Sequence, residues 1–343
     1  MTKSENESTV ITGCGWVTPI IAGTIDDVLS AYTDRESISP GDDGFAVVPE
    51  TLRDAEFNLS PELKRDRGAW MAGVALEYAR RGAVLSAESV PPERVGMVLG
   101  CALAGQLGMM DFAGEVREQT PRFVSPIHFP QTVGNYLAGA LARAYAIRGP
   151  NSTIACGAAS SLRAIIEAQG ILAGGEADLV YAGGVEQFSE ELACGLHEPD
   201  VCLSEGACWF VLERSDHAGS RGVTPLATLS DIDVTRGGAG ADGEDLEGIR
   251  SSAGIEEENT IVIEHWIGRC LGGLGAAATA AAIGAVRGHP LPLLARCDPR
   301  ETVISRCTPT RDATSRDTVA ASVTADAGSG RRTAIGLRIT TGN

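Results

Sequence analysis

Two spacings of apolar residues alternate along the chain. Short, mostly apolar runs are typical of buried β-strands, and apolar residues three or four positions apart are typical of helices. The strand-like runs lie at 8–19, 93–105, 151–157, 177–186, 206–222 (with a short helix), 260–268 and 318–339 (two strands around a glycine turn); the helical runs lie at 65–85, 130–147, 160–175 and 272–288. Strands that alternate with helices predict layered α/β architecture.

Two long segments interrupt this alternation. Residues 24–62 are acidic and are expected to be irregular, and residues 236–258 are acidic and glycine-rich, as in an exposed loop with a short helix. The stretches that begin at Asn151 and Asn259 share the order strand, small-residue turn, helix and glycine. This repetition suggests a duplicated α/β fold.

Composition and charge narrow the classes of function. The chain has 343 residues, of which 43% are hydrophobic, and a net charge of −17. Nucleic acids need a basic partner surface, so the charge argues against them, and it argues against docking an acidic carrier protein on this chain alone. No apolar run approaches the ~18 residues of a membrane span, and the polar start does not look like a signal peptide, so the cytoplasm is predicted.

Nine cysteines are scattered without Cys-x-x-Cys pairs. This spacing favours neither a metal site nor a disulfide framework, and no cofactor is expected. One of them, Cys156, stands where the strand-like run of NSTIACG turns into the helix of SSLRAIIEAQG. Enzymes often place a nucleophile at such a turn, so Cys156 and the nearby Ser160 are candidates.

Five sequence blocks occur in the order in which one enzyme family carries them. They are VITGCGWVTP, RVGMVLGCALAG, the stretch from Phe123 to Gly157, GEADLVYAGGVEQFS and LSEGACWFVLERSDHAGSRG. With these blocks the chain resembles the β-ketoacyl synthases of the thiolase fold across nearly its whole length. The resemblance implies a thiolase-like α/β fold of two duplicated layered halves, 1–195 and 196–343, in one compact unit.

The family's nucleophile can be placed by its motif, Cys-x-Ser-Ser-Leu. Ser160, Ser161 and Leu162 match the end of that motif, which puts Ala158 at the position of the nucleophile. Cys156 lies two residues earlier, at the end of the strand, where a side chain faces the core or the opposite side of the sheet. Cys156 is therefore interpreted as a packed core cysteine rather than as the nucleophile.

The family's histidines and lysine are also replaced. Arg269 stands where the resemblance expects the histidine of a Gly-His-x-x-Gly-Ala-x-Gly block, and Glu264 stands where it expects the lysine five residues earlier. The best match to the second histidine block, RGGAGADGEDLEG, begins at Arg236. His265 adjoins Glu264 but is expected on the other face of its strand.

Within the family, this set of replacements is the pattern of chain length factors in type II polyketide synthases. The resemblance implies a chain that is not an enzyme by itself and that pairs with a ketosynthase α subunit. The partner would supply the catalysis and the main docking surface for the acyl carrier protein, and this chain would limit the length of the growing polyketide. Short loops favour a polyene product over an aromatic one.

The same resemblance implies two sets of residues at the partner and the tunnel. The edge strand and a nearby turn would form the dimer interface, with Gly134, Asn135, Ser152, Thr153, Ile154 and Ala155. Gln106, Met109 and Ala113 recur on one face of a helix and would line the acyl tunnel, although Met109 and Ala113 can equally be ordinary core residues.

Two other functions stay open. The chain can be a thiolase-fold acyltransferase or hydrolase with Cys156 or Ser160 as a non-standard nucleophile, but none of the five histidines, His128, His197, His217, His265 and His289, lies in either of the two blocks that carry the family's catalytic histidines. The chain can also be a homodimeric scaffold or a lipid-binding module.

Overall fold

The computed structural model describes most of the first 236 residues and parts of the remainder. The described residues are 8–33, 45–54, 57–86, 89–119, 121–196, 202–236, 261–262, 267–289, 305–311, 319–325 and 333–340. The strands are β1 (Thr9–Val17), β2 (Ala22–Thr24), β3 (Phe45–Ala46), β4 (Val95–Gly100), β5 (Asn151–Ile154), β6 (Leu179–Glu186), β7 (Leu203–Ser204), β8 (Gly206–Arg214), β9 (Ala227–Arg236), β10 (Ile261–Val262), β11 (Ser305–Arg311), β12 (Val319–Ala325) and β13 (Thr333–Thr340). The α-helices are α1 (Ile25–Thr33), α2 (Pro61–Arg65), α3 (Arg67–Gly82), α4 (Gln106–Glu118), α5 (Tyr136–Ala144), α6 (Ser160–Ala173), α7 (Glu190–Gly195), α8 (Ser215–Ser220) and α11 (Leu274–Val286), and short 3₁₀ turns include η4 (Phe129–Thr132) and η6 (Leu271–Gly273).

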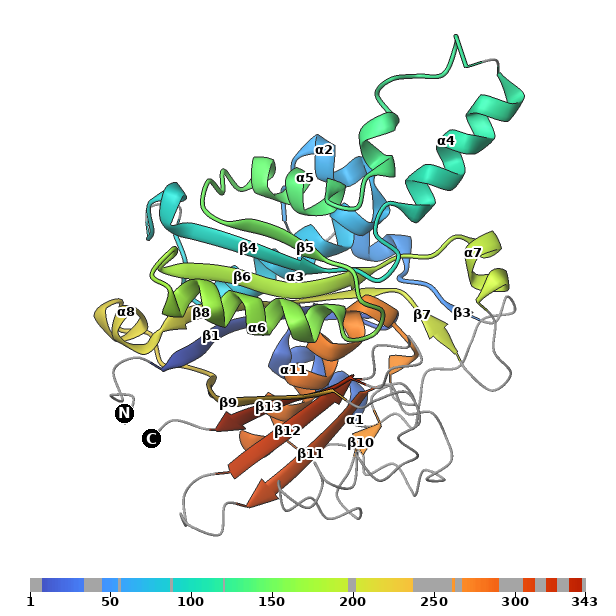
Figure 1. Cartoon of the computed structure of the whole chain (residues 1–343). Helices are drawn as coiled ribbons and strands as arrows, with labels where there is room; N and C mark the ends of the chain where they lie inside the picture. The colour runs from blue at the N-terminus through green and yellow to red at the C-terminus, as the bar shows by residue number, and fades with distance from the viewer. Residues whose placement is uncertain are drawn as a thin grey trace.

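One mixed sheet of eleven strands runs through the molecule (Figure 1). Its order is β10-β11-β12-β13-β9-β1-β8-β6-β4-β5, with β2 paired to β1. Strand β4 runs parallel to both β5 and β6, whereas β8 is antiparallel to β6 and β1. The two parts of the sheet join where β1 pairs with β9 over three residues, from Thr9↔Leu229 to Ile11↔Ala227. Strand β5 ends the sheet, so one of its edges has no neighbouring strand among the described residues.

Helices cover both faces of this sheet, and side chains alternate between the two cores. Along β8, Trp209 packs into the core under α3 and α5, and Phe210 packs into the core under α6 and α11. The alternation follows from the two-residue period of a strand, and both faces are apolar because both are covered. The predicted α/β class is therefore confirmed.

Helix α1 corrects one expectation, because residues 24–62 were expected to be irregular. Asp27 accepts hydrogen bonds from the backbone N–H and the hydroxyl of Thr24, at 2.9 and 2.6 Å, which starts the helix as a capping box does. Val28, Leu29 and Tyr32 then bury one face of the helix. The acidic residues Asp26 and Asp27 lie in the first turn of the helix. The acidic composition of the segment led to the expectation of irregular structure, although its apolar residues have helical spacing.

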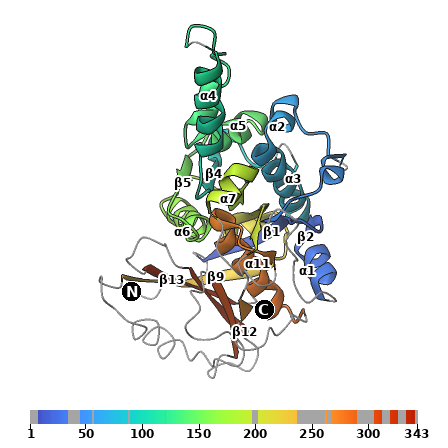
Figure 2. The ribbon, with the colours of Figure 1, turned by 90° about the vertical axis from the view of Figure 1, so that its right-hand side faces the viewer.

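The segment between Cys101 and Leu137 projects from the body of the molecule in both views (Figures 1 and 2). It contains α4, η4 and the turn between them, and we call residues 102–136 the arm. None of the described residues of the arm is buried. The predicted division of the chain into two halves, 1–195 and 196–343, stays a prediction. Within the described part of the chain, no helix has the length and apolar character needed to cross a membrane.

Close packing of α6 on the sheet generates a stability prediction. A Cβ atom at Gly100 would lie 2.3 Å from the backbone N of Ser161, so Gly100→Ala should force the helix off the sheet. Overpacking of this kind typically costs ~1–3 kcal/mol, and backbone that cannot move raises the cost. Gly170→Ala on the same helix is the matched control, because no atom lies within 4 Å of its added Cβ.

We expect urea denaturation to show a loss of unfolding free energy for Gly100→Ala. The control should be neutral or gain about 0.5–1 kcal/mol, since alanine is the better helix former. Equal stability of the two variants would contradict the close contact between Gly100 and Ser161.

Candidate active site

Ala158 lies in the turn that leads from β5 into α6. Its methyl group is buried, and Gly157 just before it has a φ of +68°, a conformation that favours glycine. The hydroxyl of Ser160 donates to the carbonyl of Gly157 at 2.5 Å and accepts from the backbone N–H of Cys156 at 2.9 Å. Ser160 is fully buried and both of its bonds hold the turn. This favours a structural role for Ser160 over a nucleophilic one.

Cys156 is the thiol of this turn, and it is only partly buried. It packs against the core that α6 and α11 share. Burial raises the pKa of its thiol, and the hydrogen bond with Ser160 and the charge of Arg163 only partly offset this rise. A nucleophilic cysteine needs the thiolate, so the environment favours the less reactive form at neutral pH.

Arg269 precedes α11, whose first turn meets the first turn of α6. Ser161 accepts a hydrogen bond from the backbone N–H of Ala276 at 2.9 Å, which links the two helices. The side chain of Arg269 is buried, and its backbone pairs with Cys202 and Ser204 beside β7. The structure thus brings the segments of Ala158 and Arg269 to the same end of two adjacent helices. Of the other replaced positions, Arg236 is the last residue of β9, and Glu264 lies outside the described residues.

The described histidines lie elsewhere in the fold, each beside a carboxylate. His128 on the arm is 2.5 Å from Glu115, His217 on α8 is 2.6 Å from Glu213, and His289 beyond the end of α11 is 2.8 Å from Asp26. His197 and His265 lie outside the described residues. No group of three His, Cys, Asp or Glu side chains that could hold a metal ion occurs among the residues that the structure describes.

Two buried carboxylates near this region were missed by sequence reasoning. Glu205 accepts from the guanidinium of Arg67 at 2.6 Å and from the backbone N–H groups of Val48 and Phe188. Glu186 ends β6 and is equally buried. The available signal was an acidic residue inside an apolar run, which has to be hydrogen-bonded when buried. The partners could not be identified, because Arg67 and Glu205 are 138 positions apart.

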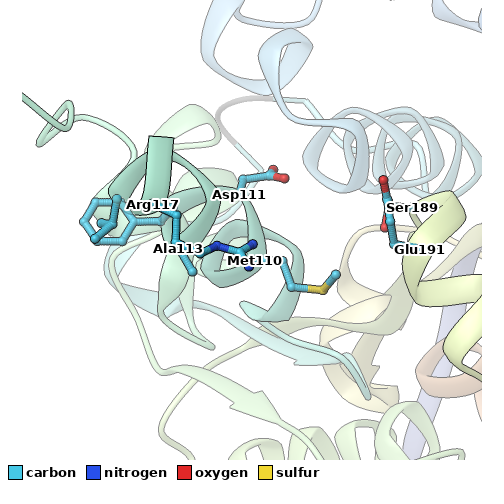
Figure 3. A pocket seen from close by; sticks show the side chains of 8 residues that line it. Met110, Asp111, Ala113, Arg117, Ser189 and Glu191 are labelled. Carbon is cyan, nitrogen blue, oxygen red and sulfur yellow. The ribbon is translucent and has the colours of Figure 1, made fainter. Parts of the chain in front are cut away.

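The residues predicted for the tunnel lie together on α4. Gln106, Met109 and Ala113 are all exposed in this chain. An open groove of about 780 Å³ separates α4 from the start of α7, and Ala113 and Met110 line it, whereas Gln106 and Met109 do not. Figure 3 shows Met110 extending from α4 into this groove, opposite Ser189 and Glu191.

The residues predicted for the dimer interface lie at the edge of the sheet and the base of the arm. Ser152, Thr153 and Ile154 belong to the edge strand β5, and Ala155 follows it. Gly134 and Asn135 immediately precede α5. The side chain of Asn151 donates to the carbonyl of Ala138 at 3.3 Å, which ties β5 to α5.

Residues 7–210 match the family described as "Beta-ketoacyl synthase, N-terminal domain". Among curated proteins, the chain is 25% identical over 266 residues to 3-oxoacyl-(acyl-carrier-protein) synthase 2 of Rhizobium meliloti, with 64% of this chain and 62% of that protein covered. It is 31% identical over 160 residues to the synthase of the same name from Vibrio cholerae, with 40% and 38% covered. The chain therefore spans less than two thirds of the length of these relatives.

Solved structures resemble the whole chain. The ishigamide ketosynthase/chain length factor has a TM-score of 0.73 at 15% identity and covers 98% of this chain and 100% of its own. A type II polyketide synthase ketosynthase, in complex with its acyl-carrier protein, has a TM-score of 0.71 at 17% identity and covers 97% and 99%. At these identities the likeness shows the fold alone, and it confirms the predicted thiolase-like α/β fold.

The curated relatives correct one prediction. The sequence analysis expected a chain that is not an enzyme by itself, and this is wrong, because the relatives are named 3-oxoacyl-(acyl-carrier-protein) synthases, which are enzymes. That prediction rested on the absence of a thiol at Ala158 and of the family's histidines and lysine. A missing thiol at one position excludes one covalent intermediate at that position, and it says nothing of the other residues that the fold brings together.

The environment of Cys156 generates a prediction for its reactivity. Because burial raises the pKa of its thiol, the thiolate fraction should be small at pH 7 and grow with pH. We expect the rate of alkylation by iodoacetamide to rise about tenfold per pH unit between pH 7 and 8.5, since each unit below the pKa changes the thiolate fraction tenfold. Peptide mapping by mass spectrometry measures it.

Alkylation of the exposed Cys194 on α7 serves as a control for access of the reagent. The peptide that is no longer alkylated in Cys156→Ser is thereby identified as the one that contains Cys156. A rate at Cys156 that is already constant at pH 7 would mean an activated thiolate and would contradict the prediction.

Proposed function

Since this chain belongs to the β-ketoacyl synthase family, we propose that it works in an acyl-chain-elongating synthase as one of two paired ketosynthase-family chains. In that pair it acts as a chain length factor: its arm contributes to the wall of the acyl tunnel and limits the length of the polyketide. As a member of a family of enzymes, the chain works within an active synthase. The observation that carries the proposal is the apolar surface of the arm.

The arm exposes large apolar side chains that a chain working alone would bury. Of the nine exposed large hydrophobic residues in the described part of the chain, six lie on it: Met109, Met110, Phe123, Ile127, Phe129 and Val133. Exposed large apolar side chains gathered on one segment are typical of a place where another molecule binds. Because the arm projects from the body, a partner would contact it on more than one side. A second chain of the same family would have an arm and a sheet edge of the same kind to pack against it.

The edge of the sheet beside the arm supports the same partner. Strand β5 pairs only with β4 among the described strands, and an edge strand readily pairs with another chain. The hydroxyl of Thr153 on β5 is buried and has no hydrogen-bond partner within the described residues. Pairing of β5 with its counterpart in the second chain would continue the sheet and supply partners there. Gly134, Asn135 and Ser152 to Ala155 would lie in that interface.

The groove between α4 and α7 supports a role in shaping the tunnel. Met110 and the small Ala113 line it, so the groove is open at the point where a larger side chain would close it. Met110 is flexible and can adapt to a straight or bent acyl chain. Gln106 and Met109 are exposed on the same helix and do not line the groove, and in the pair they would face the second chain.

The carrier protein would bind mainly through the second chain. The net charge of −17 makes this chain a poor surface for an acidic carrier, and like charges suppress association. The neighbour that was solved with its acyl-carrier protein has this fold, which supports a carrier as a partner of the pair.

A second candidate function is acyl transfer at Cys156. It is favoured by the position of this partly exposed thiol in the turn before α6, two residues from the place of the family's nucleophile. An acyl adduct on Cys156 in intact-protein mass spectrometry, after incubation with acyl carrier protein, would support it. Absence of the adduct in wild-type complex that forms product would leave the tunnel role as the function.

The first prediction from this proposal concerns the arm. Ile127→Asp places a charge on a side chain that is 77% exposed in the isolated chain and that the second chain would bury. We expect the variant to fold and to lose co-purification with the ketosynthase, because burial of an unpaired charge is costly. Size-exclusion chromatography of the co-expressed chains measures it.

Val84→Asp is the matched control, since Val84 is 74% exposed, lies outside the arm and has a φ of +52° that aspartate tolerates. It should co-elute as the wild type does. Co-elution of Ile127→Asp as well would remove the arm from the interface.

The second prediction concerns chain length. Ala113→Phe fills the groove between α4 and α7 without disturbing the chain's own core, because Ala113 is exposed. We expect the complex to release products shorter by one or more two-carbon units. Product profiling by mass spectrometry at matched yield measures the change. Glu118→Phe adds the same ring at an exposed position of α4 that does not line the groove, and its product distribution should be unchanged.

An intact Ala113→Phe complex with the wild-type product distribution would exclude α4 from the tunnel.

A further inference from the structure

Glu186 is a buried carboxylate within the block GEADLVYAGGVEQFS, and neither the candidate catalytic positions nor the proposed tunnel gives it a role. It is the last residue of β6 and is 1% exposed. The preceding residues of the strand are apolar or glycine, and the side chain lies at the end of the sheet from which both the arm and α11 begin. A carboxylate at such a place costs folding free energy unless donors surround it.

The donors come from two segments that are far apart in the sequence. One carboxylate oxygen, Oε2, accepts from the backbone N–H of Ala102 at 2.8 Å and from that of Gly272 at 2.9 Å. The other oxygen accepts from the N–H of Leu103 and from the thiol of Cys101, both at 3.2 Å. A single atom of Glu186 therefore bridges the turn after β4 and the turn before α11.

Each of these turns directs a functional segment. Residues 101–103 follow β4 and lead into α4, so their orientation sets the direction in which α4 leaves the sheet. Gly272 belongs to η6, between Arg269 and α11. The two turns touch each other, because a Cβ atom at Gly272 would lie 2.3 Å from the N of Ala102. Burial raises the pKa of Glu186 to about 7, and the backbone hydrogen bonds counteract that rise.

We propose that Glu186 is a positioning residue for α4: it fixes the root of the arm against the turn that follows Arg269 and so sets the shape of the acyl tunnel. The inference rests on the proposed function of α4. The ionised carboxylate suits this role, since it offers two acceptor atoms and no donor to a site where three backbone N–H groups converge. An apolar side chain would leave these N–H groups without acceptors.

The test compares Glu186→Ala, Glu186→Gln and Cys101→Ala in the complete two-chain complex. Alanine removes both acceptors. Glutamine keeps one oxygen, which can take the bridging place between Ala102 and Gly272, while its NH₂ group faces the N–H of Leu103. Cys101→Ala removes the thiol donor and leaves the three backbone bonds, so it controls for the loss of packing.

Two readouts separate positioning from simple stability. Hydrogen–deuterium exchange of peptides covering 101–105 and 270–274 reports on the amides, and mass spectrometry reports on product length at matched folded fraction. We expect Glu186→Ala to speed exchange in both segments by roughly tenfold or more, since loss of a buried hydrogen bond typically shifts such an equilibrium by that order. Its products should spread over several chain lengths.

In Glu186→Gln, the amides of 270–274 should again exchange slowly, and faster exchange should remain only near Leu103. The distribution of product lengths should also narrow toward that of the wild type. Cys101→Ala should behave as the wild type. If the alanine variant does not fold, the difference in exchange between the two segments of Glu186→Gln is sufficient to test the inference. Wild-type protection in both segments of a folded Glu186→Gln or Glu186→Ala complex would overturn the inference.

Ala113→Phe serves as the reference for product length. If it changes the products and Glu186→Ala does not, the positioning role is wrong and the proposed function stands. If neither changes the products although exchange is faster, α4 does not shape the tunnel, and both the proposed function and the inference that rests on it fail.

Discussion

Three glycines allow backbone to touch backbone where β4, β6, α6 and η6 meet. A Cβ atom would lie 2.3 Å from the N of Ser161 at Gly100, 2.6 Å from the Cβ of Ser161 at Gly184, and 2.3 Å from the N of Ala102 at Gly272. No side chain fits between these segments, so their relative positions are fixed by contact rather than by adaptable packing. The candidate active site and the root of the arm are both built on this junction.

Where segments pack this closely, buried backbone N–H and C=O groups need hydrogen-bond partners with short or branched polar side chains. Serine hydroxyls and a carboxylate with its two acceptor oxygens fill that need here. Ser161 binds the N–H of Ala276, Ser160 holds the turn before α6, and Glu186 gathers three N–H groups from two turns. The arm leaves the junction immediately afterwards, through Gly105 at a φ of +76°. The same junction that buries these groups therefore directs a segment none of whose described residues is buried.

Local patterns could predict the elements but not their long-range partners. Helices α3, α6 and α11 and the pair β12–β13 could be read from apolar spacing and glycine turns, because each is determined by neighbouring residues. Strands β9 and β11 were missed, since alternating polar residues leave little apolar signal. The buried carboxylates Glu186 and Glu205 were missed because their partners lie far along the chain. Exposure of α4 could not be predicted either: its apolar residues have the spacing of a core helix, and only the fold shows that none of them is buried by the described part of the chain.

The register of the family motif illustrates the same limit for activity. Ala158 is assigned by Ser160, Ser161 and Leu162, yet the side chain at one position does not determine the chemistry of a site that several segments build. The scaffold around Ala158 is intact: the left-handed Gly157, the buried Ser160 and the first turn of α6 keep their hydrogen bonds. The groove between α4 and α7 is a separate feature, lined by apolar and charged side chains together. None of the hydrogen bonds that hold this turn involves the side chain at 158, so the turn itself does not depend on a cysteine there.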